Sequence, residues 1–329
     1  MAGGYQNAAG QLYATVGGGY SNSASGVGAF VGGGGNDGTP GSNVASGAAS
    51  VIGGGIFNTA TKRAATVGGG YNNLANGAGA FIGGGGYDGT TFGNNVASGG
   101  AAVISGGNFN QAGADYATVG GGEFNTAKNV FATVPGGYQN VASGPNSFAA
   151  GSSANATNTG AFVWSDNSIS SPIYSTADNQ FMARCVGGVI FTSGSSGGNQ
   201  AVAWTPGAGS WSFTSDRNVK EGFAPVDARS VLAKLGRLPI TEWNYIGYPQ
   251  RHIGPMAQDW HALFPLNASD TTLNSADLTG ISLAAIQGLY QTVQEKDARI
   301  TALEQRLAEL EKKLEALAGS AAKRSELAP

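Results

Sequence analysis

Charge, cysteine and long apolar runs are all scarce in this chain. Only 11% of the 329 residues are charged, less than half the share of an average soluble protein, and the net charge is -3. Such a sequence offers no basic surface for nucleic acid. We also find no apolar run long enough to insert into a membrane and no secretory signal at the N-terminus. The one cysteine, Cys185, cannot form an internal disulfide, and we expect a small buried apolar residue there.

Proline is rare as well, with 11 residues, whereas glycine is very common, with 56. The glycines follow no Gly-X-Y period, which excludes a collagen helix. They are unevenly placed: most lie before Ser215, and most of the charged residues lie after it. The chain therefore changes character at Ser215, and we expect different folds on the two sides.

A repeat runs through the first part of the chain. An apolar residue before a glycine run recurs every 15 residues, as from Val16 to Val31 and from Val67 to Ile82. Two units are longer and carry Gly-rich insertions at Gly35–Ser42 and Gly86–Asn94. An asparagine occupies the same point of each unit: Asn7, Asn22, Asn43, Asn58, Asn73, Asn95, Asn110, Asn125, Asn140 and Asn155.

This pattern predicts coils that stack into a β-roll or β-solenoid over residues 1–165. Each unit has one short β segment whose Val or Ile can join a continuous apolar column only when the units stack. Glycine corners permit positive φ, and asparagine suits the opposite corner, in the left-handed conformation, where stacked side chains can form a ladder. Because such a thin coil has little core of its own, we expect three chains to share a common core.

The units, such as Asn43-Val-Ala-Ser-Gly47 followed by Val51-Ile-Gly-Gly-Gly55, resemble the head repeats of trimeric autotransporter adhesins. The resemblance implies a left-handed parallel β-roll trimer that binds surfaces. A host-surface glycan or protein receptor would then meet the exposed insertions, 35–42 and 86–94.

Two other interpretations of the repeats are weaker. Calcium-binding repeats need regular carboxylates, and here only Asp37 and Asp88 have a suitable context. An ice-binding face needs a regular array of threonines, which residues such as Phe30 and Phe81 interrupt. We therefore expect neither a metal nor a cofactor.

Residues 166–214 lack the repeat and predict a β-rich neck. Phe181–Phe191 and Ala201–Trp204 have the composition of short strands between Gly/Ser turns. Three tryptophans, Trp164, Trp204 and Trp211, are expected to pack in a core or an interface.

At the end of the neck, Ser215 and Lys220 lie five positions apart. A lysine in its neutral form can act as the base that activates a serine nucleophile, and a turn can bring the two together. The segments Ser215–Lys220, Arg251–Asp259 and Ile281–Tyr290 resemble the endosialidase-type intramolecular chaperones at the C-termini of phage tail spikes and fibres.

That resemblance implies a domain, 215–284, which trimerises, drives folding of the upstream fibre and then cuts itself off. It implies cleavage of the Thr214–Ser215 bond, with Ser215 as nucleophile and Lys220 as general base. Asp216 and His252 are candidates for supporting roles.

Leucine heptads end the chain and predict a coiled coil over residues 285–318. Lys296 is the one polar member of the series, which otherwise comprises Ile286, Leu289, Val293, Ile300, Leu303, Leu307, Leu310, Leu314 and Leu317. We also expect a helix over Val226–Leu235 and a strand end followed by a helix within Ile253–Leu263. The tail, 319–329, is expected to be disordered.

Together these features predict a mainly β, homotrimeric fibre or adhesin, located outside the cell on a virion tail fibre or a bacterial surface. One alternative is a purely structural fibre whose Ser/Lys pair is inert. Another is a glycan-degrading tail spike, but that chemistry needs paired carboxylates. The acidic residues before Ser215 occur singly: Asp37, Asp88, Asp115, Glu123, Asp166 and Asp178.

Overall fold

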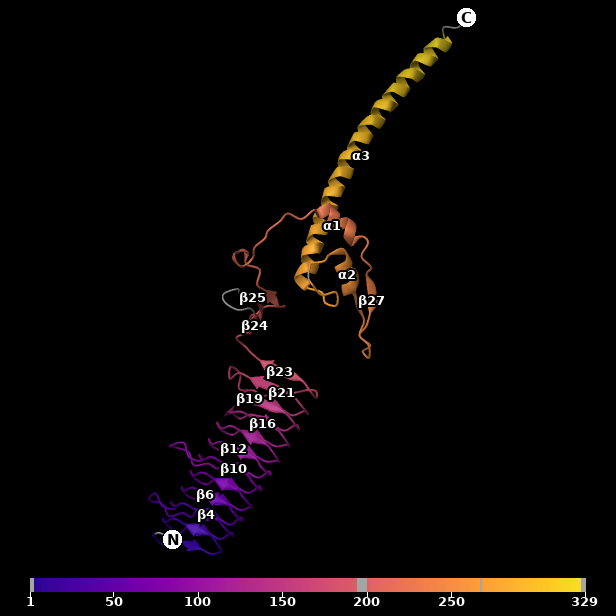
Figure 1. Cartoon of the computed structure of the whole chain (residues 1–329). Helices are drawn as coiled ribbons and strands as arrows, with labels where there is room; N and C mark the ends of the chain where they lie inside the picture. The colour runs from indigo at the N-terminus through magenta and orange to yellow at the C-terminus, as the bar shows by residue number, and fades with distance from the viewer. Residues whose placement is uncertain (1–2, 194–199, 267, 327–329) are drawn as a thin grey trace. The chain divides into compact units, whose positions relative to one another are not determined.

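The computed structural model of the chain describes residues 3–193, 200–266 and 268–326. Its contacts divide the chain into two compact units, one ending at Ser215 and the other beginning at Asp216 (Figure 1).

The first unit is mainly a β-solenoid of about 12 turns, which confirms the predicted fold class. Each coil contributes one short strand to each of two parallel sheets, and every strand pairs with the equivalent strand of the next coil. One sheet has the order β1 (Ala8–Ala9), β3 (Ser23–Ala24), β5 (Val44–Ala45), β7 (Thr59–Ala60), β9 (Leu74–Ala75), β11 (Val96–Ala97), β13 (Gln111–Ala112), β15 (Thr126–Ala127), β18 (Val141–Ala142), β20 (Ala154–Ala156) and β22 (Ile173–Tyr174).

The other sheet carries the fully buried Val and Ile residues of the solenoid. Its order is β2 (Thr15–Val16), β4 (Phe30–Val31), β6 (Val51–Ile52), β8 (Thr66–Val67), β10 (Phe81–Ile82), β12 (Val103–Ile104), β14 (Thr118–Val119), β16 (Thr133–Val134), β19 (Phe148–Ser152), β21 (Phe162–Ser165) and β23 (Phe181–Arg184), with β17 (Gly137–Tyr138) paired to β19.

The core of the solenoid is a column of small apolar side chains. In a regular coil, one Val or Ile and two alanines, such as Val67 with Ala60 and Ala65, are completely buried. These residues form one continuous cluster from Val16 to Val163. A coil of this chain therefore fills its own interior, whereas the sequence led us to expect little core within one chain.

The predicted asparagine ladder forms along one side of this column. Asn58 is fully buried, and its Oδ1 accepts a hydrogen bond from the backbone N–H of Asn73 in the next coil (3.0 Å). Its Nδ2 donates to the carbonyl oxygens of Gly54 (3.0 Å) and Gly70 (2.8 Å). Equivalent bonds recur from coil to coil, so each asparagine ties three coils together.

The left-handed conformation is not at the ladder asparagines, as we had predicted, but at the residue before seven of the ten: Gln6, Ser21, Phe57, Asn72, Phe109, Phe124 and Gln139. Ser21 and Phe57, for example, have φ values of 53° and 60°. With the left-handed residue outside, the asparagine that follows turns inward and its amide reaches the glycine carbonyls.

The two insertions leave the solenoid at the same kind of corner and project from one side of it (Figure 1). Each is a small closed loop: Asn36 bridges Pro40 in the first, and Tyr87 bridges Phe92 in the second. The Asp88 carboxylate accepts hydrogen bonds from the backbone N–H groups of Thr91 and Thr90, which lower its pKa. Asp88 thus closes a turn.

The solenoid continues beyond residue 165, where the sequence placed its end. Strand β21 pairs with β23, and β20 pairs with β22, although the spacing between coils is no longer regular. The extra residues form a loop held by Arg184, whose guanidinium donates to the Ser165 hydroxyl (2.6 Å) and the Ile169 carbonyl (2.9 Å). Hydrogen bonds from the Ser168 hydroxyl and the Val186 N–H lower the pKa of Asp166 in this loop. The sequence period does not reveal these coils, because their spacing is irregular and the hydrogen bonds of Arg184 hold the extra residues in place.

After the solenoid comes a three-stranded antiparallel sheet of β24 (Val189–Ser193), β25 (Gln200–Trp204) and β26 (Ser212–Phe213). The predicted strand 181–191 is thus two strands in two sheets. Trp204 and Trp211 pack edge to face, with ring centroids 5.5 Å apart, yet both stay more than a third exposed. Cys185 lies in the turn between β23 and β24 and is only half-buried, contrary to our expectation of a buried residue.

The second unit has a small α+β region followed by a long helix. Its elements are η1 (Arg217–Val219), α1 (Ala228–Leu235), β27 (Thr241–Trp243), β28 (His252–Gly254), α2 (Ala257–Leu263) and α3 (Ser275–Glu326). The Asp227 side chain caps α1 by accepting from the N–H groups of Arg229 and Ser230. The apolar core of the second unit comprises Val231, Leu238, Trp260, Phe264 and Ala285.

Helix α3 carries the heptads and extends on both sides of the predicted coiled coil. It starts at Ser275, where Asn274 caps it by accepting from the Ala276 N–H (2.8 Å). It is helical through Glu326, although the sequence predicts a disordered tail from residue 319, because Ala, Lys and Glu are strong helix formers. Residues 327–329 of that tail lie outside the described residues.

Candidate functional site

The segment around the predicted cleavage bond begins at a fixed point on β25. The Thr214 N–H donates to the Ala201 carbonyl (3.0 Å), and the Thr214 hydroxyl oxygen accepts from the Ala201 N–H (3.1 Å). Thr214 is thus held in register with the sheet, although its side chain is exposed. The carbonyl carbon of the predicted scissile bond consequently belongs to an anchored residue.

Beyond this anchor, Ser215 ends the first unit and Lys220 lies in the second. Asp216 caps the short helix η1, because its carboxylate accepts from the backbone N–H (2.9 Å) and side-chain amide (3.0 Å) of Asn218. Lys220 ends η1, and its backbone N–H donates to the Arg217 carbonyl (3.2 Å). The side chains of Ser215 and Lys220 are exposed in the single chain. Their catalytic roles stay predictions.

A second feature is the hairpin of β27 and β28, whose tip is rich in aromatic and apolar residues. Arg251 forms an ion pair with Glu242 across the hairpin (3.0 Å). Tyr245 and Tyr248 are mostly exposed at the tip, and Ile246 is 99% exposed. The tip therefore exposes large aromatic and apolar side chains to water in the single chain.

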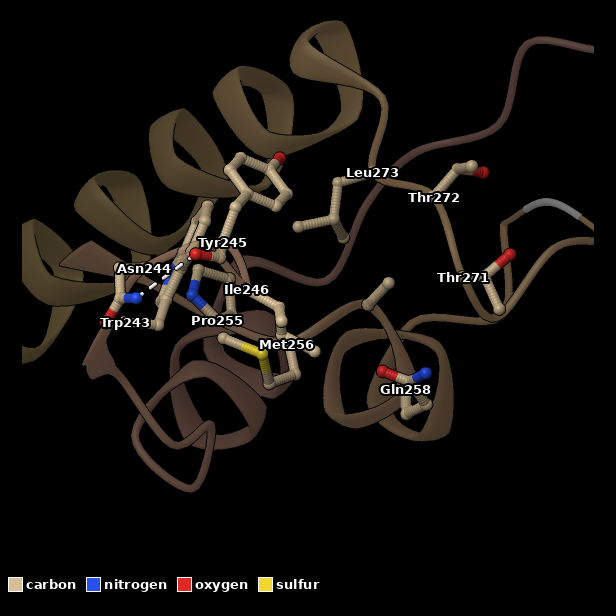
Figure 2. Close-up of a pocket in the computed structure, with 11 residues that line it drawn as sticks. Trp243, Asn244, Tyr245, Ile246, Pro255, Met256, Gln258, Thr271, Thr272 and Leu273 are labelled. Atoms are coloured by element: carbon tan, nitrogen blue, oxygen red, sulfur yellow. Dashed lines mark hydrogen bonds between the residues drawn. The ribbon is translucent and has the colours of Figure 1, made fainter. Parts of the chain in front are cut away.

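Next to the hairpin is an open pocket of 640 Å³, which sequence reasoning did not identify (Figure 2). Its aromatic and apolar end is formed by Trp243, Tyr245, Ile246, Pro255, Met256 and Leu273, and its polar end by Gln258, Thr271 and Thr272. Asn244 also lines it, and donates to the Tyr245 carbonyl (3.1 Å). The cluster of aromatic residues around Gly247 is the sequence signal that could have revealed it.

His252 belongs to this aromatic cluster. Its ring stacks on Trp243, with centroids 4.6 Å apart, and contacts Tyr245 edge to face. This packing gives His252 a structural place in the hairpin. The supporting role near Ser215 and Lys220 that the sequence suggested is not tested by this position and stays a prediction.

Within the described parts of the chain, no three His, Cys, Asp or Glu side chains are grouped as they would be around a metal ion. In the same residues, no helix combines the length and apolar character needed to cross a membrane.

Comparison with known proteins places a family on the segment that begins at the junction. Residues 215–267 match the family model described as "chaperone of endosialidase". The match starts at Ser215 and covers η1, α1, the hairpin and α2, but not α3. Comparison with curated proteins gives no match. Residues 215–267 thus form an endosialidase-type chaperone domain, and this domain follows a β-solenoid in the same chain.

Proposed function

We propose that this chain is a tail-fibre-type protein which assembles as a homotrimer through its chaperone domain and then cleaves itself once at Thr214–Ser215. The observation that carries the proposal is the chaperone family match, which begins at the predicted nucleophile and follows the solenoid and its antiparallel sheet in the same chain. A domain of this type implies a trimeric assembly, and it suggests a virion-associated or extracellular location.

The heptad residues of α3 support association. In the single chain, the side chains of nine large apolar residues at the heptad positions are between 44% and 69% exposed: Ile286, Leu289, Val293, Ile300, Leu303, Leu307, Leu310, Leu314 and Leu317. A continuous stripe of this kind is buried when helices pair with knobs-into-holes packing. Three parallel copies of α3 would cover it.

For the cleavage itself we propose an acyl shift, which the residue types at the junction can support. The Ser215 hydroxyl oxygen attacks the Thr214 carbonyl carbon while the Lys220 amine takes the hydroxyl proton. The C–N bond breaks, the Ser215 nitrogen takes a proton, and an ester now joins Thr214 to the Ser215 oxygen. Water hydrolyses that ester, leaving a carboxylate on Thr214 and a free amino group on Ser215. The nucleophile adjoins its own scissile bond, so its effective concentration is high without a substrate pocket.

Assembly controls the timing in this proposal. Exposed lysine amines are protonated in neutral water, and burial favours the neutral form that can accept a proton. Both Ser215 and Lys220 are exposed in the single chain. Packing of three chains around the junction would exclude water from it, so that cutting follows folding.

Intact mass and native gels of freshly expressed protein test this proposal. The wild-type chain is expected to give trimers and two fragments that divide at Thr214–Ser215. Ser215→Ala and Lys220→Arg should remain trimeric and uncut, because alanine has no nucleophile and arginine does not release its proton. Ser212→Ala, a neighbouring exposed serine, is the control and should cut normally.

The outcomes separate the rival interpretations. An uncut wild-type trimer would leave a structural fibre with an inert Ser/Lys pair. A monomer would overturn the assembly proposal. In the mature fibre, the solenoid would contact a host-surface glycan or protein receptor, and release of sugar from a polysaccharide would instead indicate a glycan-degrading spike.

A further inference from the structure

The two insertions of the solenoid enclose a trough between them. Strands β4 and β10, which precede the insertions, are three strand positions apart in their sheet, a separation of about 14 Å at ordinary strand spacing. The two coils between the insertions form the floor, where Ile56 bridges Tyr71. The trough is lined by Asp37 of the first insertion, by Gly85, Tyr87 and Phe92 of the coil that carries the second, and by Gly55, Ile56, Gly70 and Tyr71 of the floor.

The aromatic wall is a flat, fixed platform. Tyr87 stacks on Phe92 with centroids 4.5 Å apart and ring planes at 12°, and Phe92 also contacts Tyr71 at 4.7 Å. Tyr87 and Phe92 are nevertheless 48% and 57% exposed. The loop behind them is closed by the Asp88 carboxylate and by the Tyr87 hydroxyl, which donates to the Gly89 carbonyl (2.8 Å).

Glycine is required at the floor because the coils stack closely there. Gly55 and Gly70 have φ values of 87° and 86°, and a Cβ at either would lie about 2 Å from the carbonyl oxygen of the next coil. Because both residues also line the trough, its floor presents backbone rather than side chains at these two positions.

The charge and shape of the lining identify the class of ligand. Among the residues that line the trough, one is a carboxylate and none is Lys or Arg, so an anionic ligand would be repelled. Rings that stack on one another form a platform, whereas an ammonium ion is held by rings that surround it. A ligand ring with a flat apolar face and hydroxyl groups at its edge matches both the aromatic platform and the single carboxylate. Its face would pack on the aromatic rings, and one hydroxyl would donate to Asp37.

We propose that this trough binds a neutral saccharide, with the flat face of a pyranose ring on Phe92 and a sugar hydroxyl on the Asp37 carboxylate. The inference rests on the proposed fibre function, because it names the ligand class that the solenoid would meet at a host surface.

Saturation-transfer NMR on the full chain tests the site. The neutral probes are cellobiose, lactose and N,N′-diacetylchitobiose, and sialyllactose is the anionic comparison. At least one neutral probe should receive saturation on its ring protons, and sialyllactose should receive much less. If none of the neutral probes binds, or if sialyllactose binds best, the proposal is wrong.

Three variants locate the binding. Phe92→Ala should weaken it at least about tenfold, as expected for the loss of a central aromatic contact. Asp37→Asn keeps the shape and should weaken the neutral probe while reducing discrimination against sialyllactose. Tyr116→Ala removes an exposed aromatic residue that does not line the trough, and it should bind like the wild type. Equal binding by the wild type and both trough variants would overturn the proposal.

The same samples keep this inference separate from the proposed function. Intact mass and native gels report cleavage and trimer formation on them. A cleaved trimer that binds no neutral saccharide would contradict the site alone, and an uncleaved monomer that binds one would contradict assembly and cleavage alone.

Discussion

Each buried asparagine of the ladder is stable because all its polar atoms have partners. An unpaired amide in an apolar interior is costly, whereas here the Asn58 side-chain amide bonds to the coils before and after it. The side chain thus fixes the register of adjacent coils as well as filling space. Loss of one asparagine would leave partners unsatisfied in two neighbouring coils.

Asn58→Ala is expected to lower the free energy of unfolding of the solenoid by about 2 to 4 kcal/mol, because it leaves the Asn73 N–H without its buried acceptor and removes the amide donor to the Gly70 carbonyl. Urea unfolding followed by far-ultraviolet circular dichroism measures the difference. Lys62→Ala, an exposed change in the next turn of the same coil, should change stability by less than about 0.5 kcal/mol. Equal effects of the two changes would mean that the ladder is not a stabilising element.

At this scale the sequence predicted the buried apolar positions and the ladder, because both follow from a fixed period. It did not predict which residue turns left-handed. Phe57 adopts φ 60° although aromatic residues rarely do so, and it lies directly before the buried, hydrogen-bonded Asn58. Local preference favoured asparagine at the corner, and the tertiary structure overrides it.

At the scale of elements, α1 packs on α3 through a close backbone contact. Gly288 of α3 is buried, and a Cβ there would lie 2.3 Å from the Ala228 carbonyl oxygen. Arg229 of α1 also forms an ion pair with Glu295 of α3. The glycine therefore allows the long helix to join the core of the chaperone region.

Gly288→Ala should destabilise the second unit by about 1 to 3 kcal/mol, since the added methyl group forces the helices apart. Gly280→Ala is the matched change in the same helix: nothing lies near its Cβ position, and it should stabilise the helix by about 0.5 to 1 kcal/mol. Thermal unfolding of the two variants distinguishes them by the sign of the shift in Tm. A shift of the same sign in both would contradict the packing described.

The positions of the helices were largely predictable from the sequence, but the residues at which they begin and end were not. The heptads located α3, but they could not show that it starts at Ser275, because residues of its first turns, such as Leu278 and Ile281, pack against the core of the second unit and precede the heptad series. The strand and helix within Ile253–Leu263 were correctly expected. The solenoid coils up to Arg184 were missed because they lack the sequence repeat; the Arg184 side chain holds them through hydrogen bonds such as the one to Ser165.

For the whole molecule, the exposed heptad face predicts that assembly precedes cutting. Leu307→Glu places charges in the proposed seam between helices, where burying each costs several kcal/mol. We expect sedimentation velocity to detect monomers and intact mass to detect uncut chains. Ala308→Glu introduces the same side chain beside the seam and should preserve both trimer and cleavage. Cutting by a monomeric Leu307→Glu protein would separate the two activities and contradict the proposed order.

The sequence identified the chaperone domain through three ordered segments, Ser215–Lys220, Arg251–Asp259 and Ile281–Tyr290, because the residues within each segment are contiguous. It could not identify the pocket beside Trp243 or the trough beside Phe92. Both are built from segments that only folding brings together: a hairpin with residues 271–273 in one case, and two insertions with the coils between them in the other.

The parallel register of the solenoid has a consequence for its evolution. Strands pair residue for residue with the preceding coil, and each coil contacts its neighbours. Duplication or loss of one complete 15-residue unit would thus lengthen or shorten the rod by one rung, about 4.8 Å, and leave every remaining contact in place. A deletion of a few residues would instead move glycine into the column and asparagine to the surface. Recombination between repeats can therefore change the length of the solenoid in steps of one coil. Short deletions that keep the reading frame would disrupt the solenoid instead.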